Sequence, residues 1–203
     1  MIAIIDYGVG NLFSLASSFA YIGKEAKLTS DIGEIRAADR IILPGVGAFE
    51  DAARKLSESG LDKIVVEEAR AGKPLLGICL GMQMLFERSY EYGEHKGLGL
   101  IGGSVRPMKG VVPDELKIPQ IGWNSLSFKG KKNELFKYIK EGDFVYFVHS
   151  YYGADCDESI IATTEYGAEI TAAVASGNVY GTQFHPEKSG EVGLSILRAF
   201  CEI

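Results

Sequence analysis

The chain has 203 residues, of which 46% are hydrophobic and 24% charged, and its 21 basic and 27 acidic side chains give a formal net charge of −6. This composition is typical of a globular protein, and a chain of this length buries enough surface for one substantial core. The acidic balance argues against binding to nucleic acid or anionic membranes, which depends on clustered Lys and Arg. We therefore expect one domain over residues 1–203, with no nucleic-acid or membrane partner.

The first six residues, MIAIID, lack the basic region and cleavage site of a targeting signal, so they predict a first strand and a cytoplasmic protein. The longest apolar runs have the length of buried strands and fall far short of the ~20 residues that span a bilayer. Cys79, Cys156 and Cys201 are widely spaced, and none belongs to a CxxC pair. We expect free thiols and neither a metal nor a cofactor.

The first half of the chain alternates short apolar runs with helical patterns, which is typical of an α/β fold with a largely parallel sheet. Strands are predicted over residues 2–5, 40–43 and 74–79. Helical spacing of apolar residues predicts helices around residues 12–22, 49–56 and 64–69, and a fourth that runs from Met82 through Phe86.

From about Leu98 the pattern changes to short strands separated by Gly, Pro and Lys. The predicted strands are 101–108, 120–128, 144–150, 160–164, 170–175 and 179–184, and a last helix covers 192–200. Residues 129–133 predict a solvated turn before a short helix. We expect this half to add antiparallel strands to the sheet and to close over its edge.

Cys79 lies in the segment Gly77-Ile78-Cys79-Leu80-Gly81, where a buried strand meets a helix. A nucleophile between two glycines at such a junction is typical of the sharp, strained elbow of hydrolases. The helix N-terminus would favour the thiolate form of the cysteine. A small buried thiol between two packing glycines is an equally good interpretation of these five residues alone.

A cysteine nucleophile needs a general base, and the chain has three histidines, His95, His149 and His185. His95 lies in a charged loop that predicts a solvated residue, and His149 ends a strand. His185 also ends a strand and is followed by Pro186 and Glu187. Residues two apart in an extended chain point to the same side, so Glu187 can orient the ring of His185.

Two glycine-rich loops follow predicted strands. The loop Pro44-Gly45-Val46-Gly47 can supply a backbone N–H for a developing oxyanion, together with the N–H of Leu80, although a plain strand-to-helix connection explains it equally well. Its glycines also give it the freedom to change peptide orientation. The loop Gly8-Val9-Gly10-Asn11 lacks the third glycine of a dinucleotide fingerprint, because Phe13 occupies that position.

These residues together resemble a known family. Residues 77–83 with 185–187 resemble the class I glutamine amidotransferases, which carry a Cys-His-Glu triad on an α/β, flavodoxin-like fold with a mixed, mostly parallel sheet. Five stretches are similar to one branch of that family, the glutaminase subunits of imidazole glycerol phosphate synthases: 6–11, 44–49, 119–124, 146–151 and 184–189.

The resemblance implies hydrolysis of glutamine to glutamate and ammonia. It makes Cys79 the nucleophile, His185 the general base and acid, and Glu187 the residue that orients His185. It also implies oxyanion donors at Val46 and Leu80, and it makes His149 a pocket-wall residue. The residues implied to bind the amino-acid end of glutamine are Gly47, Gln83, Ser150 and Tyr151.

The resemblance further implies a heterodimer with a cyclase subunit of (β/α)8 fold, which would use the ammonia in histidine biosynthesis. Asn11, Trp123 and Lys188 would contact this partner, although a lone Trp in a turn is also compatible with a core position. A change in the 45–47 loop when the partner binds its ligand would explain weak activity of the isolated subunit. The alternatives are a glutaminase for anthranilate, aminodeoxychorismate or guanine nucleotide synthesis, and a non-catalytic binding subunit.

Overall fold

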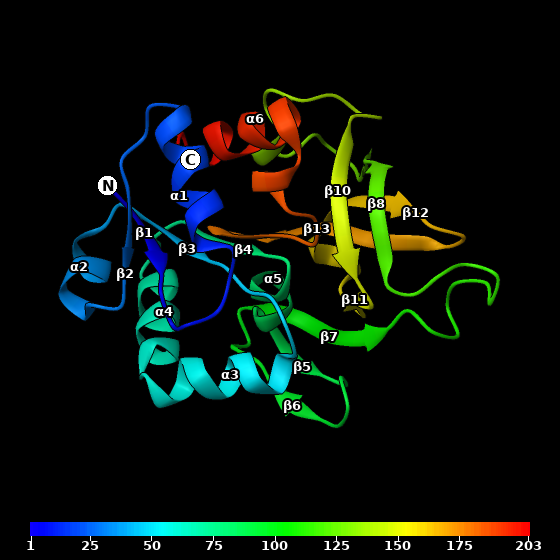
Figure 1. Cartoon of the computed structure of the whole chain (residues 1–203), viewed down its shortest axis with the longest axis horizontal. Coiled ribbons are helices and arrows are strands. Elements are labelled where there is room, and N and C mark those ends of the chain that lie inside the picture. The colour runs from blue at the N-terminus through cyan, green and yellow to red at the C-terminus, as the bar shows by residue number, and fades with distance from the viewer.

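The computed structural model describes residues 1–203 and has at its centre an eight-stranded sheet (Figure 1). Five parallel strands run in the order β2 (Ala26–Thr29), β1 (Ile2–Ile5), β3 (Arg40–Leu43), β4 (Leu75–Ile78) and β14 (Val179–Thr182). Beside β14 the sheet continues antiparallel with β13 (Glu169–Ser176), β12 (Ile160–Glu165) and β9 (Ser127–Phe128). The parallel part has the flavodoxin-like order, and the predicted α/β class is confirmed.

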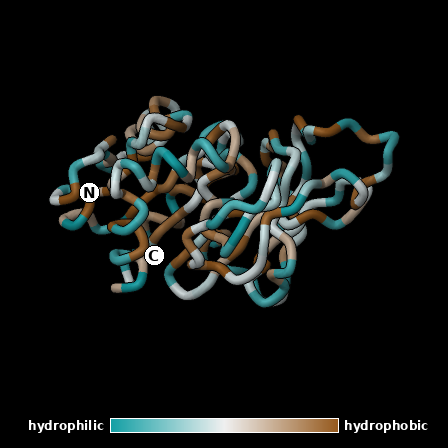
Figure 2. The backbone as a smooth tube through the Cα atoms, turned by 90° about the horizontal axis from the view of Figure 1, so that it is seen from below, coloured by the Kyte–Doolittle hydropathy of each residue, from teal (hydrophilic) through white to brown (hydrophobic).

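Helices cover both faces of this sheet. One face packs against α2 (Ile32–Ala37), α3 (Phe49–Glu58), α4 (Leu61–Arg70) and α5 (Leu80–Met84), and the other against α1 (Leu12–Tyr21) and α6 (Gly190–Phe200). Alternate strand residues enter the two cores: Ala3 and Ile5 join one, and Ile2 and Ile4 the other. Hydrophobic stretches accordingly run through the middle of the molecule in Figure 2. None of the helices is both long and apolar enough to cross a membrane.

The second half also builds two smaller sheets that the sequence did not predict. One contains β11 (Tyr151–Ala154), β7 (Ile101–Pro107), β5 (Phe86–Ser89) and β6 (His95–Lys96), and the other pairs β10 (Phe144–His149) with β8 (Gln120–Ser125). The expectation that this half adds antiparallel strands to the main sheet is therefore right for β13, β12 and β9, whereas β14 joins that sheet parallel to β4. Between β7 and β8, residues 108–119 project from the body of the molecule (Figure 1).

The helix predicted from Met82 through Phe86 is wrong at its end. Helix α5 ends at Met84, and Phe86 begins β5. The cause is non-local, because the amides of residues 98–100 donate to the backbone carbonyls of residues 84–86 at 2.8–3.1 Å. Three short 3₁₀ helices complete the structure: η1 (Glu134–Phe136), which confirms the short helix after residues 129–133, η2 (Asp157–Ser159) and η3 (Pro186–Lys188).

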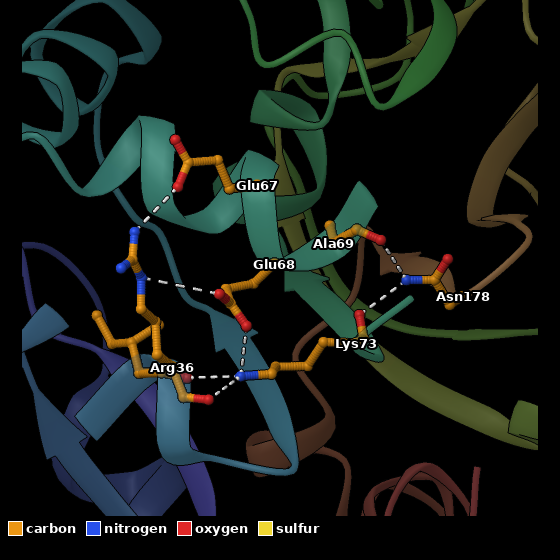
Figure 3. A network of polar contacts seen from close by, with 7 residues as sticks. Arg36, Glu67, Glu68, Ala69, Lys73 and Asn178 are labelled. Atoms are coloured by element: carbon orange, nitrogen blue, oxygen red, sulfur yellow. Dashed lines mark hydrogen bonds and ion pairs between the residues drawn. The ribbon is translucent and has the colours of Figure 1, made fainter. Parts of the chain in front are cut away.

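A polar network fixes the amino-terminal ends of the parallel strands (Figure 3). The ammonium group of Lys73, just before β4, donates to the carbonyls of Ile35 and Arg36 at 2.8 Å and pairs with Glu68 at 2.7 Å. Asn178, just before β14, donates to the carbonyls of Ala69 and Lys73. The network ties α2 and α4 to the starts of two central strands.

Candidate active site

The elbow predicted around Cys79 is present and strained. Cys79 has φ 55° and ψ −111°, a left-handed backbone that few residues other than glycine adopt. A Cβ atom on Gly77 would lie 2.7 Å from the carbonyl oxygen of Gly81, and a Cβ on Gly81 would lie 1.9 Å from that of Leu43. Both flanking glycines are therefore required by close backbone packing.

The carboxyl ends of adjacent parallel strands bring the other predicted residues to the same edge of the sheet. His185 follows β14, the neighbour of β4, and its backbone N–H donates to the Tyr146 carbonyl at 3.0 Å. Its ring Nδ1–H donates to Glu187 Oε1 at 2.8 Å, and these two side chains are 2% and 1% exposed. The side-chain amide of Asn11 lies 3.5 Å from the same carboxylate oxygen.

The imidazole of His185 is held in a state that favours its charged form. Burial opposes the charge, but the interactions with Cys79 and Glu187 outweigh burial and raise the pKa of His185 to about 9. The other ring nitrogen, Nε2, is buried and has no hydrogen-bond partner within the chain. This nitrogen is therefore free to exchange a proton with a group bound at the elbow.

Cys79 and His185 open onto a cavity of about 310 Å³. The cavity contains every predicted oxyanion and glutamine-binding residue, and Glu187 lies behind His185. Its lining is Val46, Gly47, Cys79, Leu80, Gln83, Glu91, Tyr92, Pro119, Val148, His149, Ser150, Tyr151 and His185.

The 44–47 loop packs directly on the elbow. A Cβ on Gly45 would lie 2.7 Å from the backbone nitrogen of Gly81, and Gly47 has a φ of 94°. The Tyr7 hydroxyl donates to the Pro44 carbonyl at 2.7 Å, and its pKa is raised well above the usual range by burial and then by the charge of Cys79. These contacts hold Val46 and Gly47 in the cavity wall.

Glu91 and Tyr92 also line the cavity, although the sequence did not single them out, and so does Pro119, the first residue of the stretch 119–124 that carries the resemblance. Glu91 accepts a hydrogen bond at 2.6 Å from the backbone N–H of Phe49, the first residue of α3. The carboxylate therefore caps this helix directly after the 44–47 loop. Charged and aromatic residues in a short turn carry no signal for a site, because such turns are usually solvated.

Buried amides form the polar wall next to Cys79. Gln83 Nε2 donates to the Tyr151 carbonyl and to Gln183 Oε1, both at 3.0 Å, and Gln183 Nε2 lies 3.8 Å from Cys79 Sγ. His149 Nδ1 lies 2.8 Å from the same Tyr151 carbonyl. Burial lowers the pKa of His149 to about 4, so His149 is a neutral residue of the wall at physiological pH.

Asn11, Trp123 and Lys188 lie outside the cavity. Trp123 is 53% exposed, so the alternative that places it in the core is wrong. Its ring packs edge-on against Tyr146 with the ring centroids 5.9 Å apart, and Lys188 Nζ lies 6.0 Å from the centroid of the Tyr146 ring. Trp123 and Lys188 therefore flank one tyrosine.

All three cysteines are free, as expected. Cys156 lies away from the cavity, and burial raises its pKa to about 11. No group of three or more His, Cys, Asp or Glu side chains is arranged to hold a metal ion.

Comparison with known proteins decides the family. The model of the family described as glutamine amidotransferase class-I matches residues 3–202. The chain belongs to the class I glutamine amidotransferases. Two solved structures support this fold. The alignment with "Crystal structure of glutamine amidotransferase" has a TM-score of 0.76 at 19% sequence identity and covers 100% of this chain and 98% of that structure's chain. The alignment with "Structure of PurLQS from Thermotoga maritima" has a TM-score of 0.75 at 20% identity and covers 99% of this chain and 97% of that structure's chain.

Sequence relatives of this amidotransferase are much closer. A protein of Caldanaerobacter subterraneus named imidazole glycerol phosphate synthase subunit HisH is 50% identical over 204 residues, which cover 100% of this chain and 98% of the relative. A protein with the same name from Bacillus cereus is 51% identical, over 98% of this chain and 93% of its own length. Another from Wolinella succinogenes is 47% identical, over the full length of both chains.

Proposed function

We infer that this amidotransferase is the glutaminase subunit of an imidazole glycerol phosphate synthase. The full-length relatives that carry this name are about half identical to it, and this observation carries the inference. The subunit hydrolyses glutamine to glutamate and ammonia. We further propose that residues 1–203 act as one amidotransferase domain in the cytoplasm, in complex with the cyclase subunit that consumes the ammonia.

The geometry supports a thioester mechanism. Cys79 first passes its thiol proton to Nε2 of His185, which gives the imidazolium that the raised pKa of His185 favours, and the sulfur then attacks the side-chain amide carbon of glutamine. His185 then protonates the departing ammonia, and water, deprotonated by the same nitrogen, hydrolyses the thioester to glutamate and regenerates the thiol. Glu187 fixes the proton on His185 Nδ1 and stabilises the imidazolium.

The oxyanion of the tetrahedral intermediates needs backbone donors. Leu80 is the first residue of α5, so its N–H has no partner within the helix. Val46 lines the same cavity on a loop in van der Waals contact with the elbow. We assign the N–H groups of Leu80 and Val46 as the two donors, of which the loss of one costs about a hundred- to a thousandfold in rate.

The remaining wall fits the amino-acid end of glutamine. The side-chain amino group of Gln83 donates to acceptors of the protein, so its carbonyl oxygen is available to accept from the substrate ammonium. The carboxylate of Glu91 supplies negative charge for the same ammonium. Gly47, Ser150 and Tyr151 complete this end of the cavity, and we assign them to the substrate carboxylate and its hydrogen bonds.

Replacement of the nucleophile tests the proposal. In the complex with the cyclase subunit, Cys79→Ser should lower glutamate release at least about a thousandfold, while synthesis driven by added ammonia continues. Cys201→Ser changes a half-buried thiol away from the cavity and should leave both activities intact. Glutamate release that persists in Cys79→Ser contradicts the mechanism, and failure of the cyclase to bind the wild-type chain contradicts the partner.

We propose that the cyclase subunit has a (β/α)8 fold and contacts Asn11, Trp123 and Lys188. The exposed Trp123 supports an anchor at the interface, where Trp side chains often dominate binding. Trp123→Ala should raise the Kd of the complex by about thirtyfold. Tyr138→Ala, an exposed aromatic beside the chain terminus, is the matched control. Equal effects of the two changes contradict this interface.

The loop of residues 45–47 is where partner binding would act on the glutaminase. The close contact of Gly45 with Gly81 makes any substitution at Gly45 disturb the elbow itself. Gly47 has open space around its Cβ position but a φ of 94°, so Gly47→Ala strains the loop alone. This variant should reduce partner-stimulated turnover far more than complex formation, and equal losses contradict a switch in the loop.

A further inference from the structure

Gln183 is a completely buried residue that directly follows β14 and precedes the catalytic segment. A buried primary amide costs free energy unless its polar atoms are bonded. Its Oε1 accepts from Gln83 Nε2 at 3.0 Å, and its Nε2 lies 3.8 Å from Cys79 Sγ. The sulfur is the acceptor toward which the buried amino group points.

The orientation of this amide is fixed by its neighbours. The backbone carbonyl of Tyr151 can only accept, and it receives hydrogen bonds from His149 Nδ1 at 2.8 Å and Gln83 Nε2 at 3.0 Å. A half-turn of the Gln83 amide would place two oxygens together. Because Gln83 Nε2 also faces Gln183 Oε1, a half-turn of Gln183 would place two amino groups together. The amino end of Gln183 is therefore directed at the sulfur.

We propose that Gln183 is a built-in hydrogen-bond donor to Cys79 that stabilises the thiolate over the thiol. The catalytic meaning of this role rests on the proposed function, in which Cys79 is the nucleophile. The carbonyl of Val148 lies 3.9 Å from Sγ and accepts from the neutral S–H, so it favours the thiol. When the thiol proton moves to His185 Nε2, that bond is lost and the N–H of Gln183 faces a full negative charge.

Other titratable groups near the sulfur could also change the pH at which Cys79 loses its proton. His185 faces Cys79 from the segment after β14, and Tyr7 from the loop after β1. His149 lies on β10 and interacts with His185, and Glu91 lines the same cavity. Because burial holds Tyr7 and His149 neutral near pH 8, the charge of His185 is the main titrating partner of the sulfur.

The pH dependence of alkylation at Cys79 measures the effect directly. The purified chain is treated with iodoacetamide over pH 5–10, and modification of Cys79 is followed by peptide mass spectrometry, which separates it from the other cysteines. Gln183→Met keeps the length of the side chain and removes the N–H. Its alkylation midpoint should rise by about one pH unit, and kcat for glutamine should fall about tenfold with little change in KM.

Two further variants make the result decisive. Gln183→Glu keeps the oxygen that accepts from Gln83 but directs a second oxygen at Sγ, so the alkylation midpoint of Cys79 should rise at least as far. This variant also provides the test if Gln183→Met does not fold. Gln120→Met removes another completely buried glutamine that contacts His149 but not the sulfur. An unchanged midpoint in both Gln183 variants, or an equal shift in Gln120→Met, overturns the proposal. Absence of glutaminase activity in the wild-type complex would instead overturn the proposed function, because alkylation needs no glutamine.

Discussion

Buried polar groups are hydrogen-bonded at the amino-terminal ends of the parallel strands, whereas several at the carboxyl ends have no partner. At the amino-terminal ends, Lys73 has three acceptors for its ammonium group, and Asn178 donates to two carbonyls (Figure 3). At the carboxyl ends, polar atoms of Thr182, His185 and Glu187 are buried without a partner within the chain. The strained backbone of Cys79 lies at this same edge.

The difference separates groups that stabilise the fold from groups that are available for chemistry. An unpaired buried polar atom and a left-handed backbone both cost free energy, which the rest of the structure must offset. The same strands, β4 and β14, connect the two ends. We therefore expect changes at the carboxyl ends to affect catalysis more than stability, and changes at the amino ends to do the reverse.

The largest expected effect comes from the carboxylate behind His185. Glu187→Gln keeps the shape of the side chain but removes the charge that stabilises the imidazolium. Glutaminase turnover of the complex should fall about a hundred- to ten-thousandfold, by analogy with loss of the acid from other triads, while the thermal midpoint changes little. Glu191→Gln, at the exposed start of α6, is the matched control. Turnover within tenfold of wild type contradicts the assignment of Glu187.

The edge of the sheet that carries the candidate site could be predicted from sequence where short-range geometry sets it. Cys79 between Gly77 and Gly81, and Glu187 two residues after His185, are local patterns whose physical demands can be read along the chain. Glu91 and Gln183 could not be found this way. Glu91 reaches the site from a charged turn, and the orientation of Gln183 depends on carbonyls and amides brought from β10, β11 and α5.

The fold shows the same limit. Strands β1, β3 and β4 are buried apolar runs, and the sequence predicts them closely. Strand β2 was missed because only Thr29 of its four residues is buried, and α2 because six residues are too few to establish a helical period. The early end of α5 depends on the amides of residues 98–100, whose position is set by tertiary packing.

The next largest effect is expected at the amino-terminal ends of the strands, where the buried polar groups are hydrogen-bonded. Lys73→Met removes the cation that pairs with the mostly buried Glu68 at 2.7 Å and leaves this carboxylate only the longer contact with Arg36 at 4.0 Å. It also removes the donor to two carbonyls of α2. The free energy of unfolding in urea should fall by about 3 kcal/mol, since breaking a largely buried pair exposes the cost of the remaining charge. Glutaminase turnover of the folded complex should be unchanged. Glu67→Gln, whose partner Arg36 is exposed, should have little effect on either quantity. A larger loss of turnover than of stability contradicts the separation of the two ends.

The smallest effect is a pH dependence of stability that comes from His185, at the carboxyl ends of the strands. The pKa of His185 is raised to about 9 in the folded chain, against about 6.5 in an unfolded one, so the folded state binds the proton more tightly. This contribution to the free energy of unfolding is complete below pH about 6.5 and is lost as the pH rises through about 9. We expect the loss to be at most about 3 kcal/mol, measured as the difference between wild type and His185→Gln in urea titrations across this range.

Cys79→Ser should reduce this pH dependence of stability, because the interaction with Cys79 is the largest that raises the pKa of His185. His95→Gln should leave it unchanged, and parallel curves for wild type and His185→Gln would show that the ring of His185 is not held in its charged form.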